Sequence, residues 1–285
     1  MKLSATKIKD FQEVVLGYYT KHARTRLAWR KNTSDYYVVV SEIMLQQTQV
    51  DRVIPFFNNW IEQFPNWQAL ASASQVSILR HWKGLGYNSR ALRLHKLAKI
   101  IVSEYNSQLP ADLQILEKLP GIGPYTAGAI MAFVYNKPVV MIETNIRRVF
   151  LYHFFQGIDS VHDRDILELV AKTLPDKNIR QWYWALMDYG SYLGRELKID
   201  GKKYNPNVTS RHYTKQSKFT GSDRQVRGKI LELLLQQKTN SMDFKKIYIQ
   251  LSVLSNDTDR IDGILETLRV EGFLKIQSGK IMLKN

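Results

Sequence analysis

Apolar residues recur every three or four positions through most of the chain from residue 7 to residue 200. The pattern is clearest in four segments, which cover residues 50–64, 75–83, 90–105 and 163–174. This spacing places one apolar stripe along a helix, so each segment is predicted to be an amphipathic helix. Prolines fall near the ends of these segments, as is typical of helix boundaries. The N-terminal body is therefore predicted to be all-α.

The pattern changes between Arg195 and Lys218, where the chain is polar, basic and poor in large aliphatic residues. This stretch indicates either a linker or an extended segment that lies over another surface. Beyond it, three segments with helical periodicity precede two short strand-like segments that are joined by a turn. These segments are residues 223–236, 243–252, 257–271, 273–277 and 280–283. Three helices followed by a β-hairpin predict a small winged-helix-like α+β domain.

The predicted domains are a helical body over residues 1–197, a basic linker over 198–220 and the winged-helix-like domain over 221–285. Two interpretations of the last domain stay open. It could bind DNA or protein, or it could be a small packing domain.

The charge balance indicates a polyanionic partner. The 285 residues include 41 lysines and arginines against 26 aspartates and glutamates, which gives a formal net charge of +15. Such a surface favours nucleic acid, although an anionic membrane surface or a merely solvated basic surface has the same charge signature. No apolar run approaches the roughly 18 residues of a membrane span, and the N-terminus has no apolar signal-peptide core. We therefore expect a cytoplasmic protein, associated with the nucleoid if the source is bacterial.

The chain contains no cysteine. Disulfides, thiol nucleophiles, cysteine-bound zinc and iron–sulfur clusters are thereby excluded. The six histidines are scattered and form no HExxH motif. No metal or other cofactor is expected.

The stretch LPGIGPYTAGAI, residues 119–130, is predicted to form a tight hairpin that leads into a helix. Gly121 and Gly123 permit close backbone approach and positive φ, so that successive N–H groups can point at a phosphate. Leu119 and Ile122 would anchor the hairpin in the core. A Pro-Gly-X-Gly turn is common, but before a helix of small residues in a basic chain it is typical of a helix-hairpin-helix, which binds the DNA backbone.

The stretch PVVMIETNIRRV, residues 138–149, places Glu143 where an apolar segment ends, and two arginines follow it. Glu143 could stabilise a helix N-terminus through the helix dipole. Alternatively, a carboxylate beside DNA could offset the positive charge that develops on a sugar during glycosidic cleavage. Spacing alone leaves both interpretations open.

Three further stretches identify a resemblance to a known family. They are SEIMLQQTQVDRVIPFFNNWIEQFP, HWKGLGYNSRALRLHKLA and the hairpin LPGIGPYTAGAI. Together they closely resemble the MutY-type adenine DNA glycosylases, members of the helix-hairpin-helix superfamily that also includes endonuclease III. The match runs from about Trp29 to Tyr192, with several independent motifs in the family order. The resemblance implies a two-lobed helix-hairpin-helix DNA glycosylase fold.

The resemblance assigns roles to the candidate catalytic residues. Glu42 matches the general acid that protonates the adenine leaving group, a role that needs a buried carboxyl with a raised pKa. Asn145 matches the residue that orients the sugar and the attacking water. Tyr125 stands where the bifunctional lyases of the superfamily carry a lysine that forms a Schiff base. Since tyrosine cannot do so, the resemblance implies a monofunctional enzyme that uses water.

The resemblance also implies the DNA contacts. Gln47 matches the residue that wedges into the duplex, and Tyr87 matches the aromatic residue that stacks beside the opposing base. Leu45 would line the base pocket, with Trp29 and Arg30 near it. Further DNA contacts are predicted for the hairpin residues 121–123 and for basic side chains, namely Arg147, Arg148, Lys198, Lys202, Lys203 and Arg211.

The chain departs from the family pattern in three places. Glu143 stands where the family has its catalytic aspartate, so the charge is kept but the side chain is one methylene longer. A basic segment after Gly194 replaces the four cysteines of the family's iron–sulfur cluster. The C-terminal region is too short for the family's Nudix-like domain. The winged-helix-like domain could replace the function of that domain or only add affinity.

The sequence therefore predicts a monomeric, monofunctional DNA glycosylase of base excision repair. Its partner would be double-stranded DNA with a mismatched or oxidised base pair, and not a membrane. The favoured substrate is adenine opposite 8-oxoguanine or guanine. Two alternatives stay open: a glycosylase for mismatched thymine or another modified base, and a damage-binding DNA protein without catalysis.

Overall fold

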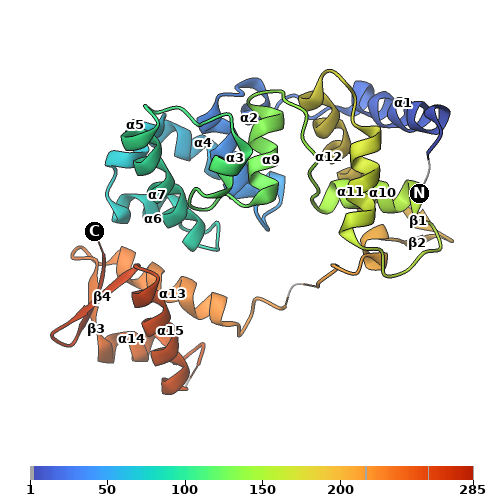
Figure 1. Ribbon diagram of the computed structural model, residues 1–285. Coiled ribbons are helices and arrows are strands. Elements are labelled where there is room, and N and C mark those ends of the chain that lie inside the picture. Colours follow the sequence, from blue (N-terminus) through green and yellow to red (C-terminus); the bar gives the residue numbers. More distant parts are fainter. Residues whose placement is uncertain (1–2, 216, 256, 285) are drawn as a thin grey trace. The chain divides into compact units, whose positions relative to one another are not determined.

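The computed structural model describes residues 3–215, 217–255 and 257–284, and most of them are helical (Figure 1). The body consists of α1 (Ala5–His22), α2 (Ala28–Lys31), α3 (Asp35–Leu45), α4 (Val50–Gln63), α5 (Trp67–Ser72), α6 (Gln75–Trp82), α7 (Ser89–Glu104), α8 (Leu113–Glu117), α9 (Pro124–Phe133), α10 (Thr144–Phe154), α11 (Asp163–Thr173) and α12 (Ile179–Glu196). The predicted all-α body is confirmed, and the four helices predicted from periodicity end within one or two residues of the observed bounds.

The remaining elements are β1 (Lys198–Ile199), β2 (Lys202–Lys203), the 3₁₀ helix η1 (Pro206–Thr209), α13 (Asp223–Gln236), β3 (Ser241–Asp243), α14 (Phe244–Leu251), α15 (Thr258–Val270), β4 (Leu274–Gln277) and β5 (Lys280–Leu283). The chain divides into two compact units. The first holds Met1–Glu42 with Leu109–Lys215, and the second holds Ile43–Gln108 with Gln216–Asn285. The domain bounds predicted from the sequence stay a prediction.

The core of the first unit is formed mainly by α1 and α9–α12 (Figure 1). Phe11 of α1 packs against Phe150 of α10 and Trp182 of α12. Helices α10 and α12 approach closely because Gly190 has no side chain. A Cβ at Gly190 would lie 2.3 Å from the backbone oxygen of Asn145, far inside van der Waals contact. This close approach fixes the first turn of α10 against α12.

The core of the second unit joins α6 to the C-terminal elements. Val76 and Leu79 of α6 lie in one buried cluster with Val226, Leu231 and Phe273. Polar contacts add to it, for example the Gln75 side-chain N–H that donates to the Gly272 carbonyl at 2.9 Å. The C-terminal helices are thus anchored on α6 through shared apolar packing.

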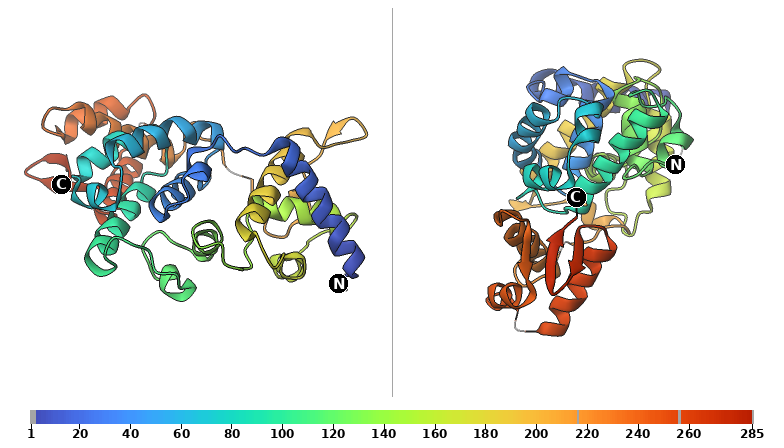
Figure 2. Two further views of the ribbon diagram at one scale, coloured as in Figure 1. Left: turned by 90° about the horizontal axis from the view of Figure 1, so that it is seen from above. Right: turned by 90° about the vertical axis from the view of Figure 1, so that its left-hand side faces the viewer.

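The C-terminal elements contain the three predicted helices and the predicted hairpin. Strand β5 lies between β3 and β4 in an antiparallel sheet, and the right-hand view of Figure 2 shows these strands beside their helices. Strand β3 was not predicted, because its three residues are too few to show a strand alternation. It pairs Met242 with Ile281 and completes the sheet.

The basic segment after α12 forms the β1–β2 hairpin and η1, and η1 packs against α10. Asn207 is buried and its side-chain N–H donates to the Thr144 carbonyl at 3.0 Å. The backbone of Val161 bonds to Thr209 and Arg211. Of the two interpretations of this segment, residues 205–211 fit the one that lies over another surface. Throughout the described chain, no helix combines the length and the apolar character needed to cross a membrane.

Candidate active site

Glu42 lies near the end of α3 with only 6% of its surface exposed. Its Oε2 accepts a hydrogen bond from the Tyr125 hydroxyl at 2.9 Å. Burial raises the pKa of the Glu42 carboxyl to about 7, and the negative charge of Glu143 adds to the rise. The hydrogen bond from Tyr125 and the charge of Arg30 oppose it. A raised pKa is what the general-acid role implied by the resemblance requires, and near neutral pH this group can give up a proton.

Tyr125 lies in the first turn of α9, directly after Pro124. Burial raises the pKa of its hydroxyl well above the ordinary value, and the negative charges of Glu42 and Glu143 act in the same direction. The hydroxyl therefore stays protonated and serves as a donor to Glu42. The charges of both carboxyl groups shift the pKa of Tyr125, so the three side chains lie close enough within the first unit to interact electrostatically.

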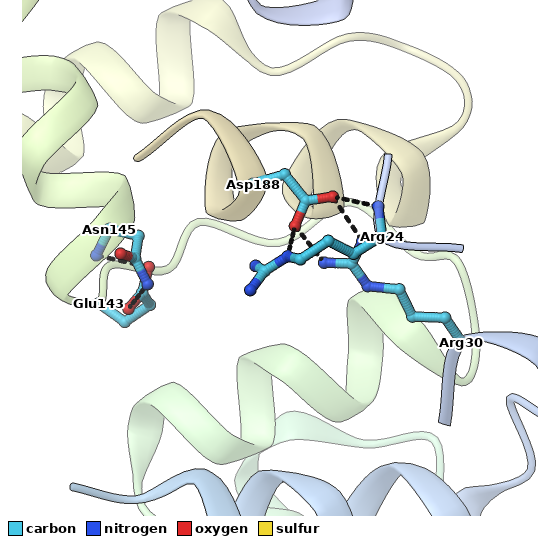
Figure 3. Close-up of polar contacts among 5 residues, drawn as sticks. All are labelled: Arg24, Arg30, Glu143, Asn145 and Asp188. Carbon is cyan, nitrogen blue, oxygen red and sulfur yellow. Dashed lines mark hydrogen bonds and ion pairs between the residues drawn. The ribbon is translucent and has the colours of Figure 1, made fainter. Parts of the chain in front are cut away.

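Glu143 is the N-cap residue of α10 (Figure 3). Its Oε1 accepts from the backbone N–H groups of Asn145 at 2.7 Å and Ile146 at 2.8 Å, and its Oε2 accepts from Asn145 Nδ2 at 3.2 Å. Burial raises the pKa of Glu143, whereas the two N–H groups and the charges of Arg148 and Arg147 oppose the rise. The capping role is thus real, and it also holds this carboxylate near Glu42.

Asn145 is fixed at both ends of its amide. Its Nδ2 donates to Glu143, and its Oδ1 accepts from an Arg148 guanidinium nitrogen at 2.8 Å. The same nitrogen donates to the Gly190 carbonyl at 2.7 Å, and Arg148 Nε donates to Asn205 Oδ1 at 3.2 Å. This network orients the amide at the start of α10.

The two arginines that follow Glu143 in the stretch PVVMIETNIRRV are both engaged within the protein. Arg147 forms a two-bond ion pair with Asp163 at 2.8 and 2.6 Å, and Arg148 is held as described above. The predicted contacts of the two arginines with the DNA strand stay a prediction. Their internal contacts arise because α10 packs against α11 and α12, which supply Asp163 and a backbone carbonyl.

A second buried charge cluster, which the sequence did not predict, surrounds Asp188 (Figure 3). Arg30 grips this carboxylate with two bonds of 2.7 and 2.9 Å, and the backbone N–H of Arg24 adds a third at 3.0 Å. Burial by itself would raise the pKa of Asp188, but the bond from Arg30 and the charges of Arg30 and Arg24 hold it below its ordinary value. Arg30 also lies over the Trp184 ring at 5.3 Å.

Asp188 interrupts the apolar pattern of α12, and this break in the pattern could have indicated a buried charge. The sequence does not show that Arg24 and Arg30 are its partners. Arg30 is therefore a structural residue that also acts on Glu42 through its charge. Trp29 is buried and Leu45 is half-buried. The predicted place of these residues in a base pocket stays a prediction.

The hairpin before α9 is partly as predicted. Leu119 and Ile122 are buried, as expected for its anchors, and Gly121 has φ +80°. The expectation of positive φ at Gly123 is wrong, because this residue is the extended N-cap of α9 with φ −97°. Lys202 and Lys203 lie exposed on β2. Their predicted contacts with DNA stay predictions.

Gln47 and Tyr87 belong to the second unit and have φ of +54° and +48°, a region that non-glycine residues seldom adopt. The Tyr87 hydroxyl accepts from Arg224 at 2.8 Å, and its ring lies near the guanidinium groups of Arg90 and Arg224 at 5.4 and 5.8 Å. The sequence identified neither arginine.

Arg90 holds the loops of Gln47 and Tyr87 in place. It is buried, and one of its guanidinium nitrogens donates to the carbonyls of Ile43, Met44 and Gln46 at 2.6–3.0 Å. The other donates to Gly86 at 2.9 Å. A buried arginine that satisfies four carbonyls can maintain two left-handed residues that would otherwise cost free energy.

The residues present do not fit the iron–sulfur cluster that the resemblance implies, since the chain has no cysteine. Within residues 3–215, 217–255 and 257–284, no group of three or more histidines, aspartates or glutamates could hold a metal ion.

Comparisons with known proteins agree on one family. The model of the HhH-GPD superfamily base excision DNA repair protein matches residues 40–173. The chain is 34% identical over 275 residues to an adenine DNA glycosylase of Mycolicibacterium smegmatis, covering 92% of this chain and 91% of that protein. It is 32% identical over 278 residues to one of Mycobacterium tuberculosis, covering 91% and 88%. A human adenine DNA glycosylase is 38% identical over 152 residues, covering 50% of this chain and 28% of that protein.

Solved structures with a similar fold include a thermostable thymine-DNA glycosylase, with a TM-score of 0.59 and 24% identity over 65% of this chain and 87% of that one. A trapped covalent intermediate of endonuclease III with DNA has a TM-score of 0.54 and 19% identity over 71% and 92%. At these identities the likeness concerns the fold alone.

Proposed function

The chain belongs to the adenine DNA glycosylase family of the HhH-GPD superfamily, and we propose that it hydrolyses the N-glycosidic bond of adenine in mispaired duplex DNA. The observation that carries this proposal is the convergence of Glu42, Tyr125 and Glu143, with the pKa of Glu42 raised to about 7. A protein that only binds damaged DNA would not need a buried carboxyl group that keeps its proton near neutral pH.

The first chemical step is protonation of the base. Adenine is extruded from the duplex, and the Glu42 carboxyl gives its proton to a ring nitrogen of the base. The bond between the sugar carbon and the base then breaks, and its electron pair leaves with the protonated adenine. Tyr125 keeps the acid oriented through its 2.9 Å hydrogen bond.

The second step concerns the sugar. Loss of the base leaves a cationic oxocarbenium-like sugar, which the Glu143 carboxylate stabilises by its negative charge. Water adds to this carbon and gives its proton to a carboxylate or to solvent. Asn145, clamped between Glu143 and Arg148, orients the groups that react. The product is an abasic site in an uncut strand.

Strand cleavage is not part of the proposed reaction. A lyase forms a Schiff base through an amine, and the residue that donates to Glu42 is a tyrosine, which has none. Gln47 and Tyr87 contact the duplex from the second unit in this proposal, and the excess of lysine and arginine supplies contacts to phosphate.

Base release from a panel of duplexes tests the proposal. Each duplex carries one mismatch or 8-oxoguanine, and alkali reveals abasic sites after incubation with the enzyme. We expect alkali-dependent cleavage at adenine opposite 8-oxoguanine or guanine. Release of thymine instead would assign the related thymine activity, and binding without release of any base would indicate a non-catalytic protein.

Two controls sharpen this experiment. Glu42→Gln should lower release by about 1,000-fold, because the amide cannot supply the proton. Borohydride treatment of the reaction should trap no covalent complex. Trapping, or cleavage without alkali, would contradict the assignment of Tyr125 as a non-nucleophilic residue.

A further inference from the structure

The segment of residues 205–211 follows α12, in the region where the resemblance implies four cysteines, and it contains none. It includes η1 and packs against α10, the helix that begins directly after Glu143. The segment is polar, yet two of its side chains are almost fully covered, since Asn207 is 3% exposed and Ser210 is 6% exposed. Polar side chains buried to this degree are normally hydrogen-bonded, so their partners indicate what the segment does.

Asn207 bonds to the first residue of α10. Its Nδ2 donates to the backbone carbonyl of Thr144 at 3.0 Å. Its Oδ1 is buried and accepts no hydrogen bond from a described residue. The donor of this amide, and not its acceptor, therefore makes the contact. Thr144 stands between Glu143 and Asn145, the two residues that act on the sugar in the proposed reaction.

Asn205 bonds to the same turn with the opposite polarity. Its Oδ1 accepts from Arg148 Nε at 3.2 Å and from the backbone N–H of Asn207 at 3.3 Å. Arg148 in turn donates to Asn145 Oδ1 at 2.8 Å. A continuous series of hydrogen bonds thus runs from Asn205 through Arg148 to the amide beside Glu143. At Asn205 the side-chain oxygen makes the contact, whereas at Asn207 the nitrogen does.

The guanidinium of Arg148 lies over two glycines of α12. Gly190 and Gly194 are about one helical turn apart, and the Gly190 carbonyl accepts from a guanidinium nitrogen at 2.7 Å. A Cβ at Gly194 would lie 2.7 Å from the guanidinium carbon of Arg148. The three atoms nearest to such a Cβ all belong to the guanidinium. A larger residue at Gly194 would therefore displace this group and not the backbone.

We propose that the 205–211 segment positions the catalytic start of α10 through Asn205 and Asn207. The inference rests on the proposed function, because Glu143 and Asn145 act on the sugar only in that reaction. Neither asparagine of the segment touches the DNA or the reacting atoms in this proposal. Both act through α10, and a small shift of the helix start is sufficient, since a misplacement of about 1 Å can lower a rate on the order of 100-fold.

Replacing each asparagine by the isosteric aspartate in the full chain is the first test. Asn205→Asp keeps an oxygen that accepts from Arg148, so it should release the base at about the rate of the parent. Asn207→Asp replaces the amide donor by an acceptor that faces the Thr144 carbonyl. Its single-turnover release should fall by about 10- to 100-fold. The loss should lie in kcat and not in KM, because neither side chain contacts DNA.

Gly194→Ala tests the same contacts from α12. Alanine is a better helix former than glycine, so the helix itself is not weakened. The added Cβ displaces the Arg148 guanidinium, and release should fall several-fold. Two matched controls lie in the same unit and should keep the rate of the parent. Gly17→Ala places its Cβ in open space, and Gln12→Ala loses a 2.9 Å hydrogen bond to the Thr173 carbonyl.

Deuterium exchange adds a readout that does not depend on catalysis. The start of α10 contains two backbone N–H groups that donate to Glu143, and their exchange reports the opening of this turn. A peptide covering residues 143–150 should exchange faster in Asn207→Asp and Gly194→Ala than in the parent. Asn205→Asp and the two controls should exchange at the rate of the parent.

Equal release by the two aspartate variants would overturn the inference, as would a fall in release that both controls share. Faster deuterium uptake with an unchanged rate of release would also overturn it, because the turn would then open without consequence for the reaction. Absence of base release from the parent defeats the proposed activity instead, and deuterium uptake by itself then decides whether the segment holds α10.

Discussion

Replacing Glu42 by glutamine tests the central acid with little change of shape. The amide has nearly the size of the carboxyl and keeps an oxygen that can accept from Tyr125, which lies 2.9 Å from Glu42 Oε2. It can neither ionise nor supply the proton that the leaving base needs. The variant therefore changes the chemistry of one group in an otherwise intact site.

The size of the effect follows from the raised pKa. With a pKa of about 7, roughly half of the molecules carry the proton on Glu42 at pH 7. At the ordinary value of 4.5, only about one molecule in 300 would carry it. Positioned general acids contribute about 100- to 10,000-fold to a rate. We expect Glu42→Gln to lower single-turnover base release by about 1,000-fold and to leave DNA affinity within about threefold.

Stability gives an independent readout of the same pKa. The folded pKa of Glu42 is higher than the unfolded one, so between about pH 4.5 and pH 7 the folded protein keeps a proton that the unfolded chain has released. The contribution of Glu42 to the free energy of unfolding therefore falls as pH rises through this window. The total fall is on the order of 3 kcal/mol.

Glutamine does not titrate, so Glu42→Gln should become more stable relative to the parent as pH rises. Urea unfolding of both proteins at pH 4.5 and pH 8 measures this difference, and the exposed Glu117→Gln serves as the matched control. An unchanged stability difference at the two pH values would refute the assignment of a strongly raised pKa. Undiminished base release would refute the role of Glu42 as the acid.

Three further predictions concern the start of α10. Glu143→Asp should retain or raise base release, because aspartate is the favoured N-cap residue and matches the family; a roughly 100-fold fall in rate would show that the pocket is built around the longer side chain. Gly190→Ala should lower both the melting temperature and base release, because its Cβ would lie 2.3 Å from the Asn145 backbone oxygen. Gly17→Ala is the control, since Gly17 has open space around it and the variant should not be destabilised. Equal melting temperatures of the two variants would contradict the packing argument. Asn205→Ala removes the oxygen that accepts from Arg148 Nε at 3.2 Å. The variant should lose about 1 kcal/mol of unfolding free energy in urea and should release the base several-fold more slowly, without a change in KM. A change in KM alone would contradict a positioning role.

The sequence was sufficient for features that depend on neighbouring residues. Helix α4 was predicted as 50–64 and is observed as Val50–Gln63, because its apolar stripe is written into a single window of sequence. Glu42, Tyr125 and Glu143 received their roles from the resemblance of short motifs to a known family, and the structure brings all three within electrostatic reach of one another. A repeat of apolar residues within one window predicts a helix, and a short motif identifies a side chain with a chemical role.

The contacts of those groups were decided by tertiary structure. Nothing in the sequence indicated that packing of α10 against α12 brings Arg148 to Asn145 and the Gly190 carbonyl, and its predicted contact with DNA stays a prediction. Arg30 binds Asp188, which stands 158 positions away along the chain. Such pairs leave no trace in a window of ten or twenty residues, because neither partner fixes the location of the other.

What the sequence alone determined was the helical character of the body, the excess of positive charge, the absence of cysteine and the identity of the acidic groups. What only the tertiary structure decided was the state of those groups. The pKa of Glu42 reaches about 7 because folding removes the carboxyl from water and brings Glu143 near it. Desolvation and the distance between charged groups depend on three-dimensional packing, so the order of residues along the chain does not show them.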